Sequence, residues 1–226
     1  MRTAWIRKVK AALRPRKKPP SHRRKKRKIS PNDVLPRFNE DFDIVGCDLS
    51  YTCPGFALLR YHADTGSVEL LRKDIVPNKT KTKKKKHGEI INEIGTMFRS
   101  YIVPVNVRVA ARERGFVQFN YSTAMLYRVQ GAIDMILWDR KQQVFQEYSP
   151  MTIKLCVAGS GSATKQDVAD AIENYCEHTP FKTDDESDAV AVALTWLIEN
   201  GYLESRPLAK YEETFRKKMA EAEEEE

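Results

Sequence analysis

The sequence predicts an α/β layer fold built on a mixed β-sheet. The expected order of elements is strand, strand, strand, helix, strand, helix, strand and then helices, which is typical of a sheet covered by helices. The opening strands predict an antiparallel meander, and the alternation that follows predicts parallel crossover connections. With 226 residues, of which 41% are hydrophobic and 31% charged, the chain can bury one main core and also carry polar tails.

The first half of the chain predicts three strands and a helix. Residues 43–50 form an apolar run that is long enough for a central strand and too short for a helix. Two further strands are expected at 56–61 and 67–71, on either side of a turn at 63–66. Apolar residues at helical spacing predict a helix over 88–101.

The second half predicts two strands and three helices. Valine-rich residues 105–111 indicate a fourth strand, and 144–148 a short fifth one. A long helix is expected over 116–138, and two more at 165–177 and 185–200, the last ended by a glycine. We expect the long helix to bury a face that includes a close-contact glycine and consists of Ala124, Met125, Tyr127, Gly131, Ile133 and Met135.

Charge divides the chain into a basic arm at 1–38, a folded domain at 39–203 and a charged tail at 204–226. Residues 1–28 contain fourteen Lys or Arg and no acid, so the net charge of +8 leaves −6 for the rest. Such a segment is expected to be disordered and to bind nucleic-acid phosphates. A solubilising or targeting extension, such as an organelle transit peptide, is the alternative interpretation.

Several classes of protein are disfavoured by what the sequence lacks. The four cysteines show neither a CxxC pair nor zinc-type spacing, and they fit reduced, buried thiols. No run of about 18 apolar residues exists, so no membrane association is expected. The N-terminus lacks the apolar core of a secretory signal, so we expect an intracellular protein.

Two acids stand at the ends of apolar strand patterns. An unpaired carboxylate inside a strand is costly to bury, so Asp48 and Glu113 each need an explanation. Asp48 could simply begin a polar loop, and Glu113 could form a surface ion pair with Arg112 or Arg114. If the two strands are neighbours, their backbones lie about 4.8 Å apart and both carboxylates can bind one cation.

A second pair of acids begins the last core helix. Asp185 and Asp188 are spaced i, i+3 and share one helix face. A capping box formed by Thr183 and Glu186 is the alternative interpretation. It explains Asp188 poorly, because the apolar part of the helix begins there. Whether Asp184 or Glu186 joins the site is left open.

Four carboxylates from two strands and one helix favour a site for hard cations. Mg²⁺, or Mn²⁺ in its place, takes oxygen ligands in octahedral geometry. Two such ions about 4 Å apart could activate a water and stabilise the leaving oxygen of a phosphodiester. The sequence therefore predicts catalytic, metal-binding roles for Asp48, Glu113, Asp185 and Asp188, and no small-molecule cofactor.

These motifs resemble the RuvC family of Holliday junction resolvases. Residues 46–50 followed by 55–59 resemble the first-strand motif with its catalytic Asp, and Glu113 resembles the second acid. Residues 153–165 are similar to the family's lysine, Gly-x-Gly-x-Ala, lysine signature, and 185–193 to its closing acid pair and buried helix. The resemblance implies an RNase H-like fold, with a five-stranded mixed sheet and helices on both faces.

The resemblance also implies DNA contacts. Phe116 falls where the family places an aromatic residue that stacks on a base, and Lys154 and Lys165 become candidate phosphate contacts. Backbone amides near two glycines could also meet a phosphate. The full set of expected DNA-binding residues is Arg112, Arg114, Phe116, Lys154, Gly159, Gly161 and Lys165.

The implied activity is Mg²⁺-dependent resolution of four-way junctions by a homodimer that makes paired nicks, with the interface on the helix at 116–138. The missing Pro-Gly after Asp48, the extra arm and the basic run at 79–86 suggest a phage or viral relative acting in the cytoplasm or nucleoid of a prokaryotic host. An organelle or the nucleus, reached through the basic arm, is the alternative location. A broader nuclease of forks and flaps, and a non-catalytic nucleic-acid-binding module, are the competing functions.

Overall fold

The computed structural model describes residues 38–78, 85–103, 107–115, 121–140, 146–177 and 179–224. The expected basic arm lies outside the described residues except for Phe38, and so do residues 79–84 of the second basic run. Phe116 also lies outside them.

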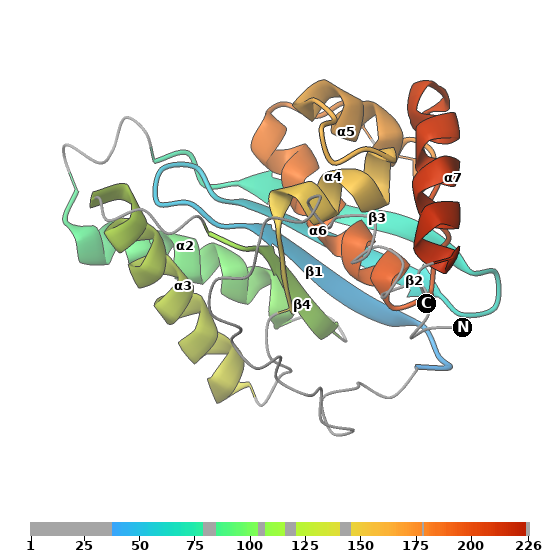
Figure 1. Ribbon diagram of the computed structural model, residues 1–226. Coiled ribbons are helices and arrows are strands. Elements are labelled where there is room, and N and C mark those ends of the chain that lie inside the picture. Colours follow the sequence, from blue (N-terminus) through green and yellow to red (C-terminus); the bar gives the residue numbers. More distant parts are fainter. Residues whose placement is uncertain are drawn as a thin grey trace.

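The fold is built on a five-stranded mixed sheet (Figure 1), as the sequence predicted. Its strands are β1 (Phe42–Asp48), β2 (Gly55–His62), β3 (Ser67–Ile75), β4 (Val107–Glu113) and β5 (Gln146–Tyr148). They are arranged in the order β3-β2-β1-β4-β5. The first three pair antiparallel, whereas β4 runs parallel to β1 and to β5. The central strand β1 therefore joins the hairpin half of the sheet to the parallel half.

Helices cover both faces of this sheet (Figure 1). On one face, α6 (Asp184–Glu199) packs on the strands, and α4 (Pro150–Ala158) and α5 (Lys165–Ile172) pack on α6. The opposite face is covered by α2 (His87–Ile102) and α3 (Tyr121–Asp139). The prediction of helices on both faces is thus confirmed.

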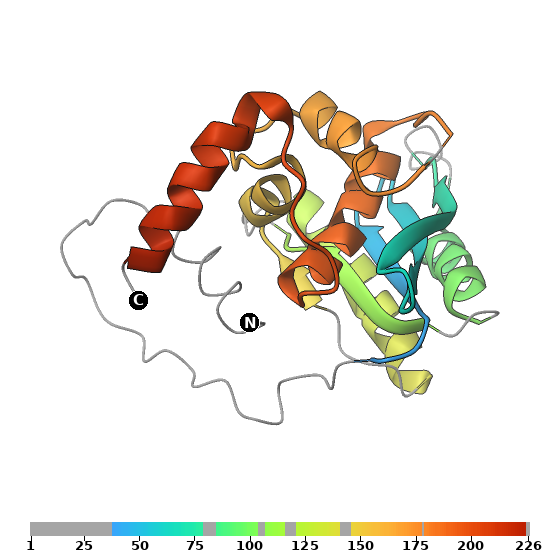
Figure 2. The ribbon, with the colours of Figure 1, turned by 90° about the vertical axis from the view of Figure 1, so that its right-hand side faces the viewer.

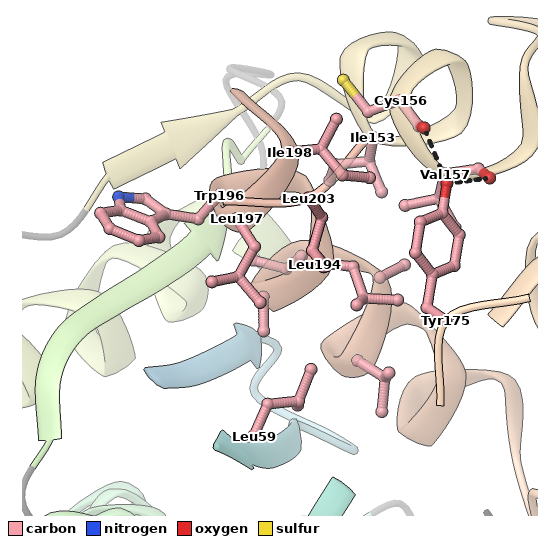
Figure 3. Packing of buried hydrophobic residues seen from close by; sticks show 14 of the residues in the cluster. Leu59, Ile153, Cys156, Val157, Tyr175, Leu194, Trp196, Leu197, Ile198 and Leu203 are labelled. Carbon is pink, nitrogen blue, oxygen red and sulfur yellow. Dashed lines mark hydrogen bonds between the residues drawn. The ribbon is translucent and has the colours of Figure 1, made fainter. Parts of the chain in front are cut away.

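Helix α6 is the centre of the larger core. It is apolar on nearly every side, and its residues from Ala189 to Ile198 are fully or almost fully buried. In Figure 3, Leu194, Leu197 and Ile198 of α6 lie among side chains from the sheet and from α4. The hydroxyl of Tyr175 donates to the carbonyl of Val157 at 3.1 Å and ties the end of α4 into this core.

Two glycines let α6 approach the sheet unusually closely. A Cβ at Gly46 of β1 would lie 2.1 Å from the Ala189 carbonyl oxygen, and one at Gly55 of β2 would lie 2.0 Å from the Asp185 carbonyl oxygen. Any larger residue would push the helix away. The absence of side chains at these positions therefore sets the height of α6 above the ends of β1 and β2.

The buried face expected for the long helix was partly wrong. Met125 and Ile133 are buried, as expected, together with Val129 and Ile136. The other expected members are exposed, and nothing lies within 4 Å of a Cβ built on the glycine. The exposed members are Ala124, Tyr127, Gly131 and Met135. The helix has apolar residues on two faces, and periodicity alone could not tell which one meets the sheet.

Two helices differ from the sequence expectation. Helix α4 was not predicted, because its nine residues were taken as a connecting signature. The last helix, α7 (Ala209–Glu224), lies in the segment that was expected to be a charged tail with a frayed helix and a solvated acidic end, yet Phe215 on it is buried against the main core. Figure 2 shows α7 running along one edge of the domain.

The expectations about cysteines and membrane spans can be compared directly with the described residues. All four cysteines are buried and carry free thiols, as predicted. None of the helices in the described ranges combines the length and the hydrophobicity that a membrane crossing needs.

Candidate metal centre and active site

Asp48 and Glu113 stand side by side at the carboxyl ends of two parallel strands. Cys47 of β1 pairs with Arg112 of β4, so the next residues along the strands, Asp48 and Glu113, are neighbours. Side chains alternate between the two faces of a strand. Asp48 shares the parity of buried Ile44, which belongs to the core on the α6 side, and Glu113 shares that of Ala111. Both carboxylates therefore face α6.

The first two turns of α6 bring the other two acids to the same edge. The carbonyl of Asp185 lies over Gly55, and Gly55 pairs directly with Asp48 across the β1–β2 ladder. Asp188, one turn later, keeps only 19% of its side chain exposed. The glycine contacts thus place the start of α6 above the end of β1, as the sequence-based hypothesis requires.

Electrostatics shows that Asp48 lies close to the other acids. Burial raises the pKa of Asp48 to about 8, and the negative charges of three nearby carboxylates add to the shift. In decreasing order of effect, these belong to Glu113, Asp188 and Asp185. The charge of Lys165 opposes the shift. Without a cation, Asp48 therefore holds a proton at neutral pH.

Glu113 and Asp188 behave in the same way. Burial raises the pKa of Glu113 to about 7, and the charge of Asp188 adds to this effect. Burial also raises the pKa of Asp188, against a hydrogen bond from Lys165 that lowers it. Half-buried acids that raise one another's pKa are a common mark of functional sites. A divalent cation would relieve this repulsion and displace the protons.

Two lysines flank the acids. The ammonium of Lys165, the first residue of α5, donates to Asp188 at 2.9 Å and lies 3.6 Å from Asp184. Burial works against its charge, but the hydrogen bond and the charges of nearby acids raise the pKa of Lys165. Lys154 on α4 is near enough for its charge to lower the pKa of Glu113. Of the two lysines predicted as phosphate contacts, Lys165 therefore bonds directly to one of the acids, and Lys154 influences another through its charge.

The site suits a hard cation by the type of its ligand atoms, although these atoms are not closely clustered. Its donors are carboxylate oxygens, the ligands that Mg²⁺ and Mn²⁺ take. Among the described residues, one group has three ligand atoms within 4.8 Å of one another, and it consists of Asp41, His62 and Asp64. No three of the four acids meet this distance. Like-charged carboxylates repel one another until a cation lies between them, which explains the wider spacing.

The neighbouring acids of α6 have separate tasks. The alternative interpretation, a capping box formed by Thr183 and Glu186, is wrong, because Thr183 makes no side-chain cap. Glu186 instead accepts from the Lys73 ammonium at 3.1 Å and from the Lys182 amide at 2.9 Å. Its buried carboxylate is therefore engaged on β3 and is turned away from the site, whereas Asp184 stays exposed beside Lys165.

The two arginines that flank Glu113 differ sharply. Arg112 is buried and bonds to Asp134 at 2.7 Å and to Glu147 at 2.7 and 2.9 Å, on the face opposite to Glu113. These contacts give it a structural role and leave little of it for DNA. Arg114 is exposed, with Glu147 at a distant 3.9 Å, and is placed to meet a ligand.

The two glycines of the loop after α4 have structural roles that a free phosphate-binding loop would not have. Gly159 adopts a left-handed conformation at φ 90° and ends α4, and its amide donates to the Leu155 carbonyl at 3.1 Å. That amide is therefore not free for a phosphate. A Cβ at Gly161 would lie 2.7 Å from the Met151 side chain, so this glycine also serves close packing.

Together, the sheet order and the acids define the class: a protein of RNase H-like fold with carboxylates gathered at the carboxyl end of its central strand. The model of the family "Crossover junction endodeoxyribonuclease RuvC" matches residues 44–196, more than half of the chain. This chain belongs to the RuvC family. The family implies the use of divalent metal ions.

Individual relatives agree with this assignment. A crossover junction endodeoxyribonuclease RuvC of Prochlorococcus marinus (strain MIT 9301) is 40% identical over 121 residues, which cover 53% of this chain and 76% of the relative. The Thermus thermophilus RuvC structure superposes with a TM-score of 0.61 at 21% identity, covering 74% of this chain and all of that one. The same enzyme in complex with Holliday junction substrate gives 0.63 at 20% identity, covering 74% and 99%. The RNase H-like fold is thus confirmed; a phage or viral origin stays a prediction.

Proposed function

We propose that this chain is a metal-dependent endonuclease that resolves four-way DNA junctions by paired nicks. The observation that carries the proposal is the convergence of Asp48, Glu113 and Asp188 from β1, β4 and α6 on one edge of the sheet, where burial raises the pKa of all three. Membership of the RuvC family supplies the reaction class. We take residues 39–203 as the catalytic domain.

The four acids and two lysines divide the chemistry between them. Asp48, Glu113, Asp185 and Asp188 would hold two Mg²⁺ ions, or Mn²⁺ in their place, which activate water and stabilise the leaving 3′ oxygen when bound. The ammonium groups of Lys165 and Lys154 would neutralise a phosphate near these acids, which is supported by the bond from Lys165 to Asp188 and the charge effect of Lys154 on Glu113. Arg114 and the basic arm would bind the DNA backbone nearby in a salt-dependent manner.

We propose a homodimer, as paired nicks require, with its interface on the outer face of α3. Apolar side chains at helical spacing are exposed there: Met135 is 60% exposed and Trp138 is 83% exposed. Tyr121 and Tyr127 continue the stripe toward the start of the helix. An exposed apolar patch of this kind is typical of an interaction surface. A second copy of the chain would cover it about a two-fold axis. The relatives are bacterial crossover junction endodeoxyribonucleases, so we expect the protein to act in the cytoplasm or nucleoid of a prokaryotic cell.

The proposal is tested by cleavage of a mobile four-way junction with Mg²⁺. The wild type should nick two opposed strands symmetrically and should leave duplex DNA intact. Asp48→Asn keeps the shape of the side chain but not its charge, and it should abolish cleavage while leaving junction binding in Ca²⁺. Equal cleavage of Y-forks and junctions would favour the broader nuclease. Unchanged cleavage by Asp48→Asn would contradict the catalytic assignment.

A further inference from the structure

Helix α7 is joined to the domain at the end of α4, although it lies outside the residues 44–196 that match the family model. The amide of Leu208, just before the helix, donates to the Ala158 carbonyl at 3.1 Å. A Cβ at Gly159 would lie 2.4 Å from Pro207. The segment leading into α7 therefore packs directly on the end of α4, which places α7 beside α5.

The carboxylate of Asp167 connects α7 to α5. Its Oδ1 accepts from the Lys210 ammonium at 2.5 Å, and its Oδ2 accepts from the Tyr211 hydroxyl at 2.6 Å. The same Oδ2 accepts from the Thr164 amide at 3.0 Å, and the Asp167 amide donates to the Thr164 hydroxyl. This capping box closes the N-terminus of α5. One buried side chain thus serves both helices.

Lys165 lies in the turn that Asp167 closes. It is the first residue of α5, and Asp167 is the third. The Lys165 ammonium reaches 2.9 Å from Asp188 and 3.6 Å from Asp184. Any shift of this turn moves the ammonium relative to the carboxylates. Since α5 has only eight residues, its own backbone hydrogen bonds do little to fix that turn.

We propose that Lys210 and Tyr211 are positioning residues for Lys165. By holding Asp167, they fix the first turn of α5 and keep the Lys165 ammonium beside the acids. The inference rests on the proposed function for its catalytic consequence, and on the contacts of α7 for its structural part. It gives a segment beyond the family match a role in the active site.

The test uses the full chain with Lys210→Met and Tyr211→Phe combined, which removes both donors to Asp167 and keeps the bulk of the side chains. Arg216→Ala is the matched control, because Arg216 lies on the same helix, is 77% exposed and, among the described residues, pairs with Glu212 at i,i+4. We would measure junction cleavage, thermal stability and the rate at which an amine-specific reagent labels Lys165, read by mass spectrometry against Lys182.

The double variant should lose about tenfold in kcat at an unchanged KM, as a small misplacement of a catalytic group does. In the double variant, Lys165 should be labelled faster than in the wild type. The conservative variant Lys210→Arg should have the kcat and the labelling rate of the wild type, and so should Arg216→Ala. Unchanged labelling of Lys165 would overturn the inference, and so would a loss of activity that only follows the unfolded fraction. A wild type that does not cleave junctions would refute the proposed function alone, since the labelling still decides this inference.

Discussion

Two groups of acids lie at opposite ends of β1, and they differ in almost every property. At the carboxyl end, burial raises the pKa of Asp48, and the like charges of the neighbouring acids add to this shift. Near the other end, Asp41 is exposed, and hydrogen bonds from the Ala63 amide and His62 lower its pKa. The ligand atoms of Asp41, His62 and Asp64 nevertheless lie closer together than those of the four acids.

The comparison teaches that spacing alone is a poor guide to a metal site. Asp41 and His62 already satisfy one another at 3.1 Å, so a cation would have to displace that ion pair. The acids around Asp48 have only Lys165 as a directly bonded partner among the described residues, and they repel one another. A cation therefore gains more from the Asp48 group than from the Asp41 group, although the oxygens of the Asp48 group are farther apart.

The largest effect should come from neutralising an acid of the Asp48 group. Glu113→Gln should reduce Mg²⁺-dependent junction cleavage by about a thousandfold or more, because the second strand then lacks its charged ligand. Single-turnover cleavage at saturating enzyme measures this loss. Asp41→Asn is the control at the other end of β1. Equal losses in both variants would erase the distinction between the two groups.

The next largest effect should come from Lys165. Lys165→Met should lower the cleavage rate by about ten- to a hundredfold, because the ammonium beside Asp188 would no longer neutralise a phosphate there. Lys182→Met is the matched control, since this lysine is exposed and contacts Glu186 through its backbone amide. A wild-type rate for Lys165→Met would remove the lysine from the mechanism.

A smaller effect should appear in the stability of the metal-free protein. Folded Asp48 keeps its proton up to a pKa of about 8, whereas the unfolded chain loses it near the ordinary value of 3.8. The folded state binds more protons between these values, so the free energy of unfolding should fall as pH rises through this window, by at most about 1.4 kcal/mol per pH unit. Urea denaturation from pH 5 to 8.5 measures the slope.

Asp48→Asn should flatten this slope, and saturating Mg²⁺ should flatten it in the wild type. A wild-type stability that rises over the same pH range in the absence of metal would contradict the account of the Asp48 group.

The smallest effect is expected for the Asp41–His62 pair near the start of β1, and it concerns thermal stability. The hydrogen bond that His62 donates to Asp41 raises the pKa of His62, so the stability that this pair contributes is present at low pH and is lost as pH rises through the folded pKa of His62. Asp41→Asn should lower Tm at pH 5 by less than about 4 °C, because exposed ion pairs contribute little. Scanning calorimetry at pH 5 and pH 8 measures the difference. A loss of metal binding in this variant would reverse the assignment of the two groups.

Sequence reasoning located the acids because strand-end carboxylates are visible as breaks in apolar runs. Asp48 and Glu113 follow such runs, and their adjacency in a parallel pair follows from the order of the elements. The closeness of α6 was not predicted, since it depends on Gly46 and Gly55 meeting the carbonyls of a distant helix. Pattern and composition cannot show that contact.

The roles of α7 and Arg112 escaped prediction for related reasons. Asp167 reads as an ordinary acid of a helix N-terminus, and its partners lie more than forty residues away. Arg112 lies next to a site residue in the chain, but strand alternation turns it to the other face, where Asp134 and Glu147 bind it. Long-range partners of polar side chains leave no local signal in a sequence.

The most direct test is a crystal structure of the protein soaked in Mn²⁺, with the ions located by anomalous scattering. The account predicts Mn²⁺ bound by oxygens of Asp48, Glu113 and Asp188, with the Lys165 ammonium displaced from Asp188. Ions bound at Asp41, His62 and Asp64, with none at the carboxyl end of β1, would contradict it.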